Sequence, residues 1–376
     1  MAIDFASVLK EMIAARASDI HLTPGFPPAI RKTGRIVPLE GYPKLGPQDT
    51  REIIYSILND SQRKKFENEH QLDMAYAVPG IARFRVNAFM QRGTLSAAFR
   101  HIPHEIKSLE QLGLPSVLTE FARKPRGFVL FTGPTGSGKS TSLAALIDMI
   151  NSEREEHILT IEDPIEFLHG HKKCIVNQRE IGSDALDFGT ALRGALREDP
   201  DVILVGEMRD LETISTALTA AETGHLVFAT LHTQSTAQTV DRIIDVFPPH
   251  QQQQVRMQLS IALQGIVTQQ LIQTADGTSR VCASEVLIPT PAIRNLIREG
   301  KTHQIYSALQ TSGAIGMQTM DSHLAQLVRS GTITSKLAQS RASVPEELVR
   351  LLAGGGAPMP AGGNGYSAAN AAASME

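Results

Sequence analysis

The sequence of 376 residues has no tryptophan, only two cysteines and no long apolar run. Two cysteines, Cys174 and Cys282, are too few for a disulfide framework or a four-cysteine zinc site. No stretch approaches the roughly 18 apolar residues that a membrane-spanning helix needs. The N-terminus carries Asp4, Glu11 and Asp19 and has no long apolar segment, which argues against a secretory signal. These absences predict a cytoplasmic protein without a transmembrane segment.

The sequence also lacks a large excess of positive or negative charge. Lys and Arg number 36, Asp and Glu number 39, and the formal net charge is −3. Proteins that coat nucleic acid usually have a strongly basic surface, so this balance argues against a nucleic-acid partner. The hydrophobic fraction of 42% is typical of a soluble globular protein, and the length predicts two or three domains.

The pattern of apolar residues changes along the chain and predicts five segments. Helical spacing at 4–17 and 48–68, with a hairpin at 82–102 that turns near 91–93, indicates an α/β domain at the N-terminus. The last segment is rich in Gly and Ala and nearly uncharged, so we expect it to be disordered. The predicted segments are an N-terminal domain at 1–105, a linker with a short docked helix at 106–126, an α/β core at 127–290, a helical region at 291–352 and the tail at 353–376.

Short apolar runs within the core segment alternate with stretches of helical length. Each run has the length of a strand that is buried on both faces, and the alternation is typical of a parallel sheet covered by helices on both sides. The runs are FVLFT at 128–132, HILTIE at 157–162, DVILVGE at 201–207 and LVFATLH at 226–232.

The strongest motif is GPTGSGKST at 133–141, which matches the phosphate-binding pattern G-x-x-x-x-G-K-[ST] and lies between a predicted strand and a predicted helix. Glycines allow backbone N–H groups to turn toward phosphate oxygens, and the N-terminus of a helix favours an anion. We therefore expect Lys139 to reach the β- and γ-phosphates of ATP and Ser140 to bind Mg²⁺. The residues predicted to surround the nucleotide are Gly133, Pro134, Thr135, Gly136, Ser137, Gly138, Lys139, Ser140 and Thr141.

Acidic residues end two of the predicted strands. HILTIE ends at Glu162, and DVILVGE ends at Glu207. Ligands of open α/β sheets bind beyond the carboxyl ends of the strands, so both acids are predicted to converge on the phosphates. Hydrolysis needs a carboxylate that holds the metal and a group that orients water. We expect Glu162 to activate water and Glu207 to hold Mg²⁺ through its water shell, and the pattern leaves the exchanged assignment open.

Histidines bracket the last of the four strands. His225 precedes it and His232 follows it, so both are candidates for sensing the γ-phosphate or polarising water. A second set, His169, His171 and Cys174, fits no common zinc spacing and predicts an ordinary solvated loop.

Arginines form the third predicted element. Arg83 and Arg85 lie two residues apart on one face of a strand, and Arg100 lies across the predicted hairpin. Positive charge aimed at a leaving phosphate stabilises its transfer and can come from a neighbouring subunit, although alternation alone also fits a solvated basic face. Further candidates, closer to the acids in sequence, are Arg193, Arg197 and Arg209.

Four motifs in this order resemble the ATPases of type II secretion and type IV pili. GPTGSGKST, ILTIEDPIEF, DVILVGEMRD and TAAETGHLVFATLHT follow that family's Walker A, Asp box, Walker B and His box. Within the family, four further segments resemble the PilT retraction ATPases: ASDIHL at 17–22, ARFRVNAF at 82–89, AIRNLIRE at 292–299 and GMQTMD at 316–321. Extension and secretion relatives usually carry a four-cysteine zinc insertion, which this sequence lacks.

The resemblance implies a PAS-like N-terminal domain, a RecA-like P-loop ATPase domain with a C-terminal helical segment, and a homohexameric ring. ATP and Mg²⁺ would bind between the two domains, and Arg83, Arg85 and Arg100 would approach the nucleotide at a domain or subunit interface. The ring would power pilus retraction and twitching motility from the cytoplasmic base of an inner-membrane platform protein, together with a paralogous retraction ATPase. AIRNLIRE is implied to serve retraction, although its spacing alone predicts an amphipathic core helix.

Alternatives remain open at this point. An accessory retraction ATPase of the PilU type shares the same motifs. A RecA-like nucleic-acid motor would show steeply salt-dependent stimulation by DNA or RNA. A non-enzymatic adaptor that binds ATP and regulates a paralogous motor would show little or no hydrolysis.

Overall fold

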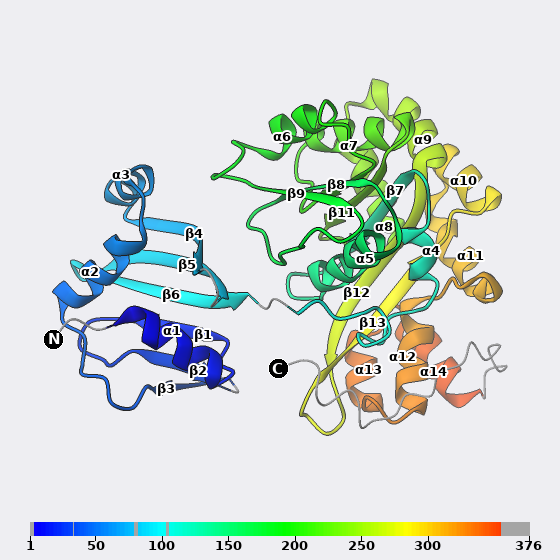
Figure 1. The fold of residues 1–376 in the computed structure, drawn as a ribbon. Helices are drawn as coiled ribbons and strands as arrows, with labels where there is room; N and C mark the ends of the chain where they lie inside the picture. The colour runs from blue at the N-terminus through cyan, green and yellow to red at the C-terminus, as the bar shows by residue number, and fades with distance from the viewer. Residues whose placement is uncertain (1–3, 33, 79–81, 103–104, 355–376) are drawn as a thin grey trace. The chain divides into compact units, whose positions relative to one another are not determined.

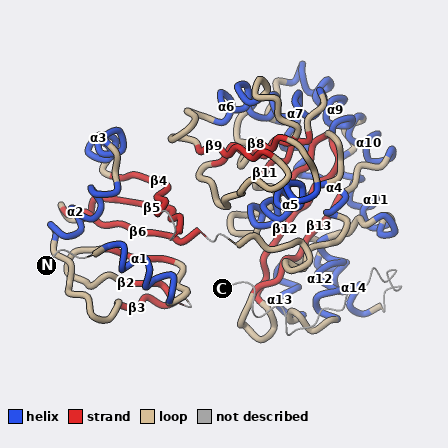
Figure 2. The backbone as a smooth tube through the Cα atoms, in the orientation of Figure 1, coloured by secondary structure: helices blue, strands red, loops and turns tan. Residues whose placement is uncertain are grey.

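The computed structural model describes residues 4–32, 34–78, 82–102 and 105–354 (Figures 1 and 2). Its chain divides into two compact units between Glu105 and Ile106. Each unit has a sheet and hydrophobic clusters of its own. Such a division is typical of domains that have separate cores.

Antiparallel strands form the sheet of the N-terminal unit, in the order β3-β2-β1-β6-β5-β4. The pairing of β5 with β6 continues to Gln91 and Thr94, which confirms the predicted hairpin and its turn. Phe84 and Val86 on β5 are buried in the core, so the alternating residues of that strand lie on the other face. The strands are β1 (Asp19–Leu22), β2 (Ala29–Lys32), β3 (Arg35–Pro38), β4 (Gln71–Val78), β5 (Ala82–Gln91) and β6 (Thr94–Ile102).

Helices of the N-terminal unit are α1 (Phe5–Ala14), α2 (Pro47–Ile57) and α3 (Asp60–Glu69). The prediction of one helical stretch at 48–68 is wrong at its middle, where two helices meet. Leu58 has extended backbone, and the Asn59 side chain caps α3 by accepting a hydrogen bond of 2.8 Å from the Gln62 N–H. Asparagine is among the preferred N-cap residues, so it begins a new helix there.

The second unit contains a seven-stranded sheet in the order β13-β12-β7-β11-β10-β8-β9. Every pair of neighbours is parallel except β12 with β13. The four predicted strands are present as β7 (Gly127–Thr132), β8 (His157–Glu162), β10 (Val202–Val205) and β11 (Leu226–Leu231). The sequence did not indicate the other three, β9 (Ile175–Glu180), β12 (Leu263–Gln273) and β13 (Arg280–Leu287).

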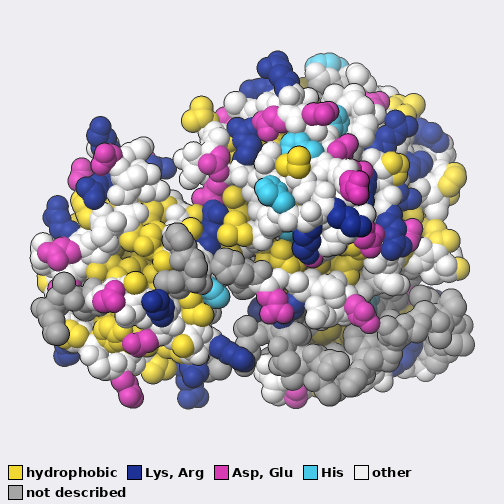
Figure 3. Space-filling view, viewed as in Figure 1, with side chains coloured by type: hydrophobic (Ala, Val, Ile, Leu, Met, Phe, Trp, Pro, Cys, Tyr) yellow, Lys and Arg dark blue, Asp and Glu magenta, His cyan; other side chains and the backbone are white. Residues whose placement is uncertain are grey.

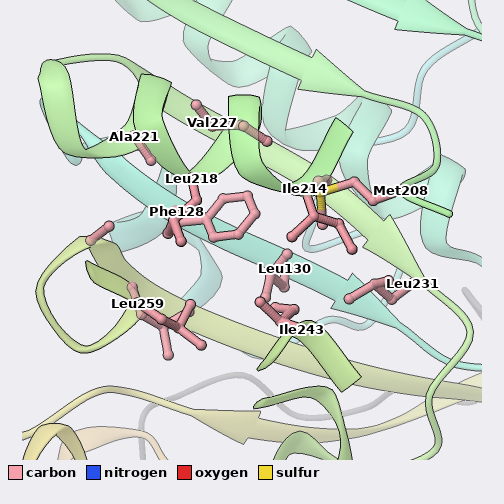
Figure 4. Close-up of a cluster of buried hydrophobic side chains, with 14 of the residues drawn as sticks. Phe128, Leu130, Met208, Ile214, Leu218, Ala221, Val227, Leu231, Ile243 and Leu259 are labelled. Atoms are coloured by element: carbon pink, nitrogen blue, oxygen red, sulfur yellow. The ribbon is translucent and has the colours of Figure 1, made fainter. Parts of the chain in front are cut away.

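Helices cover both faces of this sheet, which explains the uninterrupted apolar strands. Phe128 and Leu130 of β7 face one cluster, with residues from α7 (Leu211–Thr223), α8 (Thr236–Asp245) and α9 (Pro249–Ala262) (Figure 4). Val129 and Phe131 face the other cluster, with α4 (Leu118–Ala122) and α5 (Lys139–Glu153). α4 is therefore the short helix predicted between 106 and 126, packed on the core. α6 (Phe188–Ala195) packs beside α7.

The chain after β13 is helical as far as Ala353, as predicted. α12 (Met320–Arg329), α13 (Ser335–Arg341) and α14 (Pro345–Ala353) share a small cluster with Ile272 and Ala283 of the sheet (Figure 1). α10 (Pro291–Arg298) and α11 (Ile305–Thr311) precede them, with single 3₁₀ turns at Thr302–Gln304 and Gly313–Ile315. From residue 355 onward, the predicted disordered tail lies outside the described residues.

The surface carries charges of both signs, interspersed over the face shown in Figure 3, as the near-neutral composition requires. Within the described residues, every helix is too short or too polar to span a bilayer.

Candidate nucleotide-binding site

The carboxyl ends of four parallel strands lie at one edge of the larger sheet. β7 pairs with β11, β11 with β10 and β10 with β8, all in parallel register. The GPTGSGKST loop follows β7, Glu162 ends β8, Glu207 lies two residues beyond β10, and His232 follows β11. These groups therefore share the edge at which open α/β sheets bind their ligands.

The GPTGSGKST loop is packed directly against the neighbouring strand β12. At Gly133, where φ is 131°, a Cβ atom would lie 2.3 Å from the Gln269 carbonyl oxygen and 2.8 Å from Ser137 Oγ. Gly136 and Gly138 also have positive φ values, of 78° and 90°. The positive φ values favour glycine at all three positions, and at Gly133 the close approach to β12 also leaves no room for a side chain.

Lys139 occupies the centre of the loop. Its buried ammonium group donates hydrogen bonds to the carbonyl oxygens of Gly133, at 2.8 Å, and Pro134, at 3.1 Å. Burial lowers the pKa of Lys139, and the negative charges of Glu207 and Glu166 act in the opposite direction. A phosphate placed here would supply stronger, charged acceptors for the same ammonium group.

Other polar groups of the loop are also suited to an anion and a metal ion. Ser137 Oγ is buried, and no described residue is its hydrogen-bond partner. Ser140 is the second residue of α5 and only half-buried, beside Lys139, and Thr141 follows it. The residues present therefore fit a nucleotide phosphate, with hydroxyl and carboxylate oxygens available for the hard ion Mg²⁺.

Glu162 is buried at the end of β8. Its Oε1 accepts hydrogen bonds from Thr160 Oγ1, at 2.7 Å, and Gln178 Nε2, at 3.3 Å, and its Oε2 accepts one from the Glu166 N–H, at 3.4 Å. Burial disfavours the charged form and raises the pKa of Glu162 to about 7, in spite of these hydrogen bonds. A carboxylate with a pKa near neutrality is suited to take a proton from water.

Glu207 has the opposite electrostatic environment. Its carboxylate accepts two hydrogen bonds from Arg209, from Nε at 2.5 Å and Nη2 at 2.6 Å, and lies 3.0 Å from His232 Nε2. The Arg209 hydrogen bond has the largest effect, and together these partners lower the pKa of Glu207 although burial opposes them. Glu207 is therefore ionised at neutral pH, as a metal-holding carboxylate must be.

A glycine brings the two acids close together. At Gly206 a Cβ atom would lie 3.1 Å from both the Glu162 Cα and the Ile161 carbonyl oxygen. The Gly206 N–H donates to that same carbonyl at 2.7 Å, and Thr230 Oγ1 donates to the Gly206 carbonyl. The backbone before Glu207 is thus fixed against β8 on one side and β11 on the other.

The structure adds one acid that the motif analysis missed. Glu166 is exposed, its charge acts on Lys139, and its N–H binds Glu162. The available signal was its position four residues after Glu162, in the same EDPIEF segment.

The structure corrects the placement of His225. It precedes Leu226 at the amino end of β11, whereas His232 follows the carboxyl end, and six residues of strand separate them by roughly 20 Å. His225 Nδ1 contacts the Ala220 carbonyl oxygen at 2.9 Å, at the C-terminus of α7. Within one chain, His225 therefore does not line the edge that holds Lys139. The rule that ligands bind beyond the carboxyl ends of parallel strands already favours His232, which follows β11, over His225, which precedes it.

The three arginines of the N-terminal unit lie on adjacent strands. Arg83 and Arg85 alternate with buried residues on β5, and Arg85 is opposite Arg100 on β6. Arg100 is exposed but donates from Nε to the buried carboxylate of Asp19 at 2.9 Å. Asp19 also lies 3.9 Å from Arg31.

The other candidate arginines separate into different roles. Arg209 binds Glu207, as described above. Arg193 forms an ion pair with Glu212, which joins α6 to α7. Arg197 is exposed just after α6.

The AIRNLIRE segment forms α10 and part of the following turn. Ile293 and Ile297 are buried, as expected for an amphipathic helix. Arg294 Nη1 donates to the carbonyl oxygens of Ser260 and of Ile261, the latter at 2.9 Å. It thereby binds carbonyls that the end of α9 leaves without helical partners.

Comparison with known proteins agrees with this geometry. The family model described as type II/IV secretion system protein matches residues 74–350. PilT of Pseudomonas aeruginosa, described as a type IV pilus retractation ATPase, is 54% identical over 343 residues, which cover 91% of this chain and 99% of that protein. The type IV pilus ATPase PilU of the same organism is 44% identical over 345 residues, which cover 92% and 90%.

A solved structure extends the comparison to the fold. The crystal structure of the pilus retraction motor PilT with bound ADP has a TM-score of 0.88 and 51% sequence identity, and the match covers 93% of this chain and 99% of that one. Both the predicted fold class and the predicted resemblance are thus confirmed. The chain belongs to the type II/IV secretion system protein family, in the group of the pilus retraction ATPase PilT.

Proposed function

We propose that this protein is an ATP-hydrolysing motor that powers retraction of type IV pili and the twitching motility that depends on it. The observation that carries the proposal is the pairing of two differently tuned acids beside the Lys139 loop. Glu162 has a pKa of about 7, and Glu207 is kept ionised. Their environments shift the two pKa values in opposite directions. Glu162 is therefore suited to accept a proton, and Glu207 is suited to hold a metal ion.

Each group then has a defined role in hydrolysis. Lys139 leaves the carbonyls of its own loop and binds the β- and γ-phosphates, while Ser140 and Glu207 would hold Mg²⁺, Glu207 through water. The ion, when bound, neutralises charge on these phosphates. Glu162 accepts a proton from the attacking water, and His232 contacts the γ-phosphate, a role that its contact with Glu207 supports.

The N-terminal arginines belong to the same proposal. In a homohexameric ring, Arg83, Arg85 and Arg100 approach the nucleotide from the N-terminal unit of the same or a neighbouring chain. They supply the positive charge that phosphoryl transfer needs. Arg100 binds Asp19 through Nε, so the Nη groups of its guanidinium can still donate to a phosphate.

The retraction role is favoured over an accessory, PilU-like role. Identity to PilT is 54% and identity to PilU is 44%, over nearly equal lengths. We propose that the ring acts at the cytoplasmic base of the pilus machine, on an inner-membrane platform protein, and that a PilU-like paralogue can assist it.

The test is Lys139→Ala, measured in two ways. In the purified protein we expect ATP hydrolysis to fall by at least about 100-fold, because a charged phosphate ligand is lost. In a strain that lacks this protein, the variant should fail to restore pilus retraction and twitching, while the parent restores both. Normal twitching with Lys139→Ala would reject the motor function. Strong stimulation of the parent by DNA would instead favour a nucleic-acid motor.

A further inference from the structure

A row of three buried polar residues crosses the larger sheet at the level where β7 ends and the GPTGSGKST loop begins. Thr132 on β7 pairs in register with Thr268 on β12, and Thr268 pairs with Glu285 on β13. The two threonine hydroxyls are 2.7 Å apart, and none of the three residues is more than 2% exposed. A buried carboxylate such as Glu285 is costly unless hydrogen bonds satisfy it.

Glu285 obtains its hydrogen bonds from the first residues of two helices. Oε1 accepts from both the N–H and the hydroxyl of Thr236, the first residue of α8, at 2.8 Å each. Oε2 accepts from the N–H of Met320, the first residue of α12, at 3.5 Å. The N–H groups of a first helical turn have no partner within the helix, and the helix dipole favours a negative charge there. One carboxylate therefore caps two helices.

One of these helices begins beside the nucleotide site. α8 starts four residues after His232, and Ser235 caps it by accepting a hydrogen bond from the Gln238 N–H. Thr233 and Thr239 join their hydroxyls at 2.7 Å, which closes the loop onto the helix. The position of the first turn of α8 therefore fixes the loop that carries His232.

The other helix holds the C-terminal region together. Asp321, which follows Met320, is fully buried. It accepts hydrogen bonds from the N–H groups of Ser343 and Val344, at 2.8 and 3.0 Å, and from the Tyr306 hydroxyl, at 3.1 Å. The segment before α14 and helix α11 are thus attached to the start of α12.

A cavity lies beside this carboxylate. Its volume is about 480 Å³, and its lining includes Gln234 and Ser235 as well as Ser343 and Val344. Glu285 is also part of its wall. The loop after β11 and the segment before α14 therefore border the same cavity, and Glu285 supplies a direct polar link between α8 and α12.

We propose that Glu285 is a positioning residue that couples the His232 loop of the nucleotide site to the C-terminal helices. The coupling rests on the proposed nucleotide site. To hold α8 and α12 at the same time, one side chain must offer two acceptor oxygens. Glutamine in this position offers one oxygen, so its NH₂ group would face the N–H donor of either α8 or α12, and one link is lost.

The first experiment compares Glu285→Gln with Ser284→Ala in the full-length, assembled protein. Ser284 is the neighbouring buried residue on β13, and the described hydrogen bonds of its hydroxyl group join it to His323 of α12 and to Gln318. We expect Glu285→Gln to lower kcat for ATP about tenfold, the effect of about 1.4 kcal/mol from one unsatisfied buried donor, with KM within about twofold of the parent. Ser284→Ala should keep kcat within about twofold of the parent.

Thr236→Val provides a second variant, which removes the hydroxyl link and keeps the N–H. It should lower kcat less than Glu285→Gln, and the double variant should be no slower than Glu285→Gln alone. If a folded Glu285→Gln protein keeps kcat within about twofold, or if Ser284→Ala is equally slow, the coupling is rejected. If Glu285→Gln does not fold, an unchanged kcat in Thr236→Val rejects it.

Hydrogen–deuterium exchange separates this proposal from the proposed function, since it does not need turnover. Glu285→Gln should raise exchange at the start of the helix whose N–H donor faces its NH₂ group, which is 236–238 of α8 or 320–322 of α12, whereas Ser284→Ala should leave exchange at 236–238 unchanged. Addition of ADP and Mg²⁺ should change exchange at 320–322 in the parent and not in Glu285→Gln. An identical nucleotide response in both proteins overturns the coupling, even if the parent proves to be an active ATPase.

Discussion

The imidazole of His232 is in direct contact with the carboxylate of Glu207, with Nε2 3.0 Å from Oε1. Because β11 and β10 are parallel neighbours, the residues that follow them lie at the same edge of the sheet. Arg209 binds the same carboxylate with two donors, Nε to Oε1 and Nη2 to Oε2. Glu207 therefore has a fixed orientation and a stable negative charge.

Glu207→Ala should abolish steady ATP hydrolysis, with a loss of at least about 100-fold in kcat, because the metal-holding charge disappears. Light scattering should show the same assembly as in the parent. Glu212→Ala is the control, since the described ion pair of that acid is with Arg193 and not with Lys139. Retained turnover in Glu207→Ala would reject its assignment.

Glu162 predicts a pH dependence with opposite effects on activity and stability. Its pKa of about 7 lies above the ordinary value of 4.5, so kcat should rise with pH through about 7 as the carboxylate forms. The native state holds the proton more tightly than the unfolded state between pH 4.5 and 7. Stability from this group is therefore complete below about pH 4.5 and lost as the pH rises through 7.

Glu162→Gln tests both effects. It should remove the rise in kcat along with most of the activity. At pH 8 it should unfold at a higher temperature than the parent, and at pH 5 the difference should shrink. A parent enzyme whose rate does not change between pH 6 and 8 would contradict the role of Glu162 as proton acceptor.

Gly206→Ala should reduce kcat about tenfold while ADP binding is kept. The added Cβ would lie 3.1 Å from the Glu162 Cα, so the backbone that leads to Glu207 must move. Gly194→Ala is a matched control, because its Cβ would meet nothing closer than 3.7 Å. Equal rates for the two variants would show that the close approach of the strands is unimportant.

Arg294→Ala should cost about 1 kcal/mol of unfolding free energy, since two carbonyls at the end of α9 lose their donor. ATP hydrolysis should remain near the parent's rate, because α10 contributes no group to the Lys139 edge. Arg298→Ala, whose only described side-chain hydrogen bond is to Asn295 within α10, should cost less than about 0.5 kcal/mol. If Arg294→Ala is as stable as Arg298→Ala, the capping role is wrong, and any loss of pilus retraction would then need another cause.

The sequence allowed correct prediction of elements that have a local, regular pattern of apolar residues. Strands such as 128–132 were found because burial on both faces makes them continuously apolar. β13 was missed because polar residues interrupt it, and Glu285 among them is explained only by helices that start 49 residues before it and 35 residues after it. The pKa of Glu162 likewise depends on burial by distant segments, which no local pattern records.

The separate cores of the two units have a consequence for how the protein melts. The apolar cluster of the N-terminal unit draws its described residues from Phe5 to Phe99, and the three clusters of the second unit draw theirs from Leu109 onward. Heating should therefore give two calorimetric transitions, of which ADP raises only the one that contains Lys139. Substitutions that weaken one core leave the other transition in place, so the two units can accumulate sequence changes at independent rates.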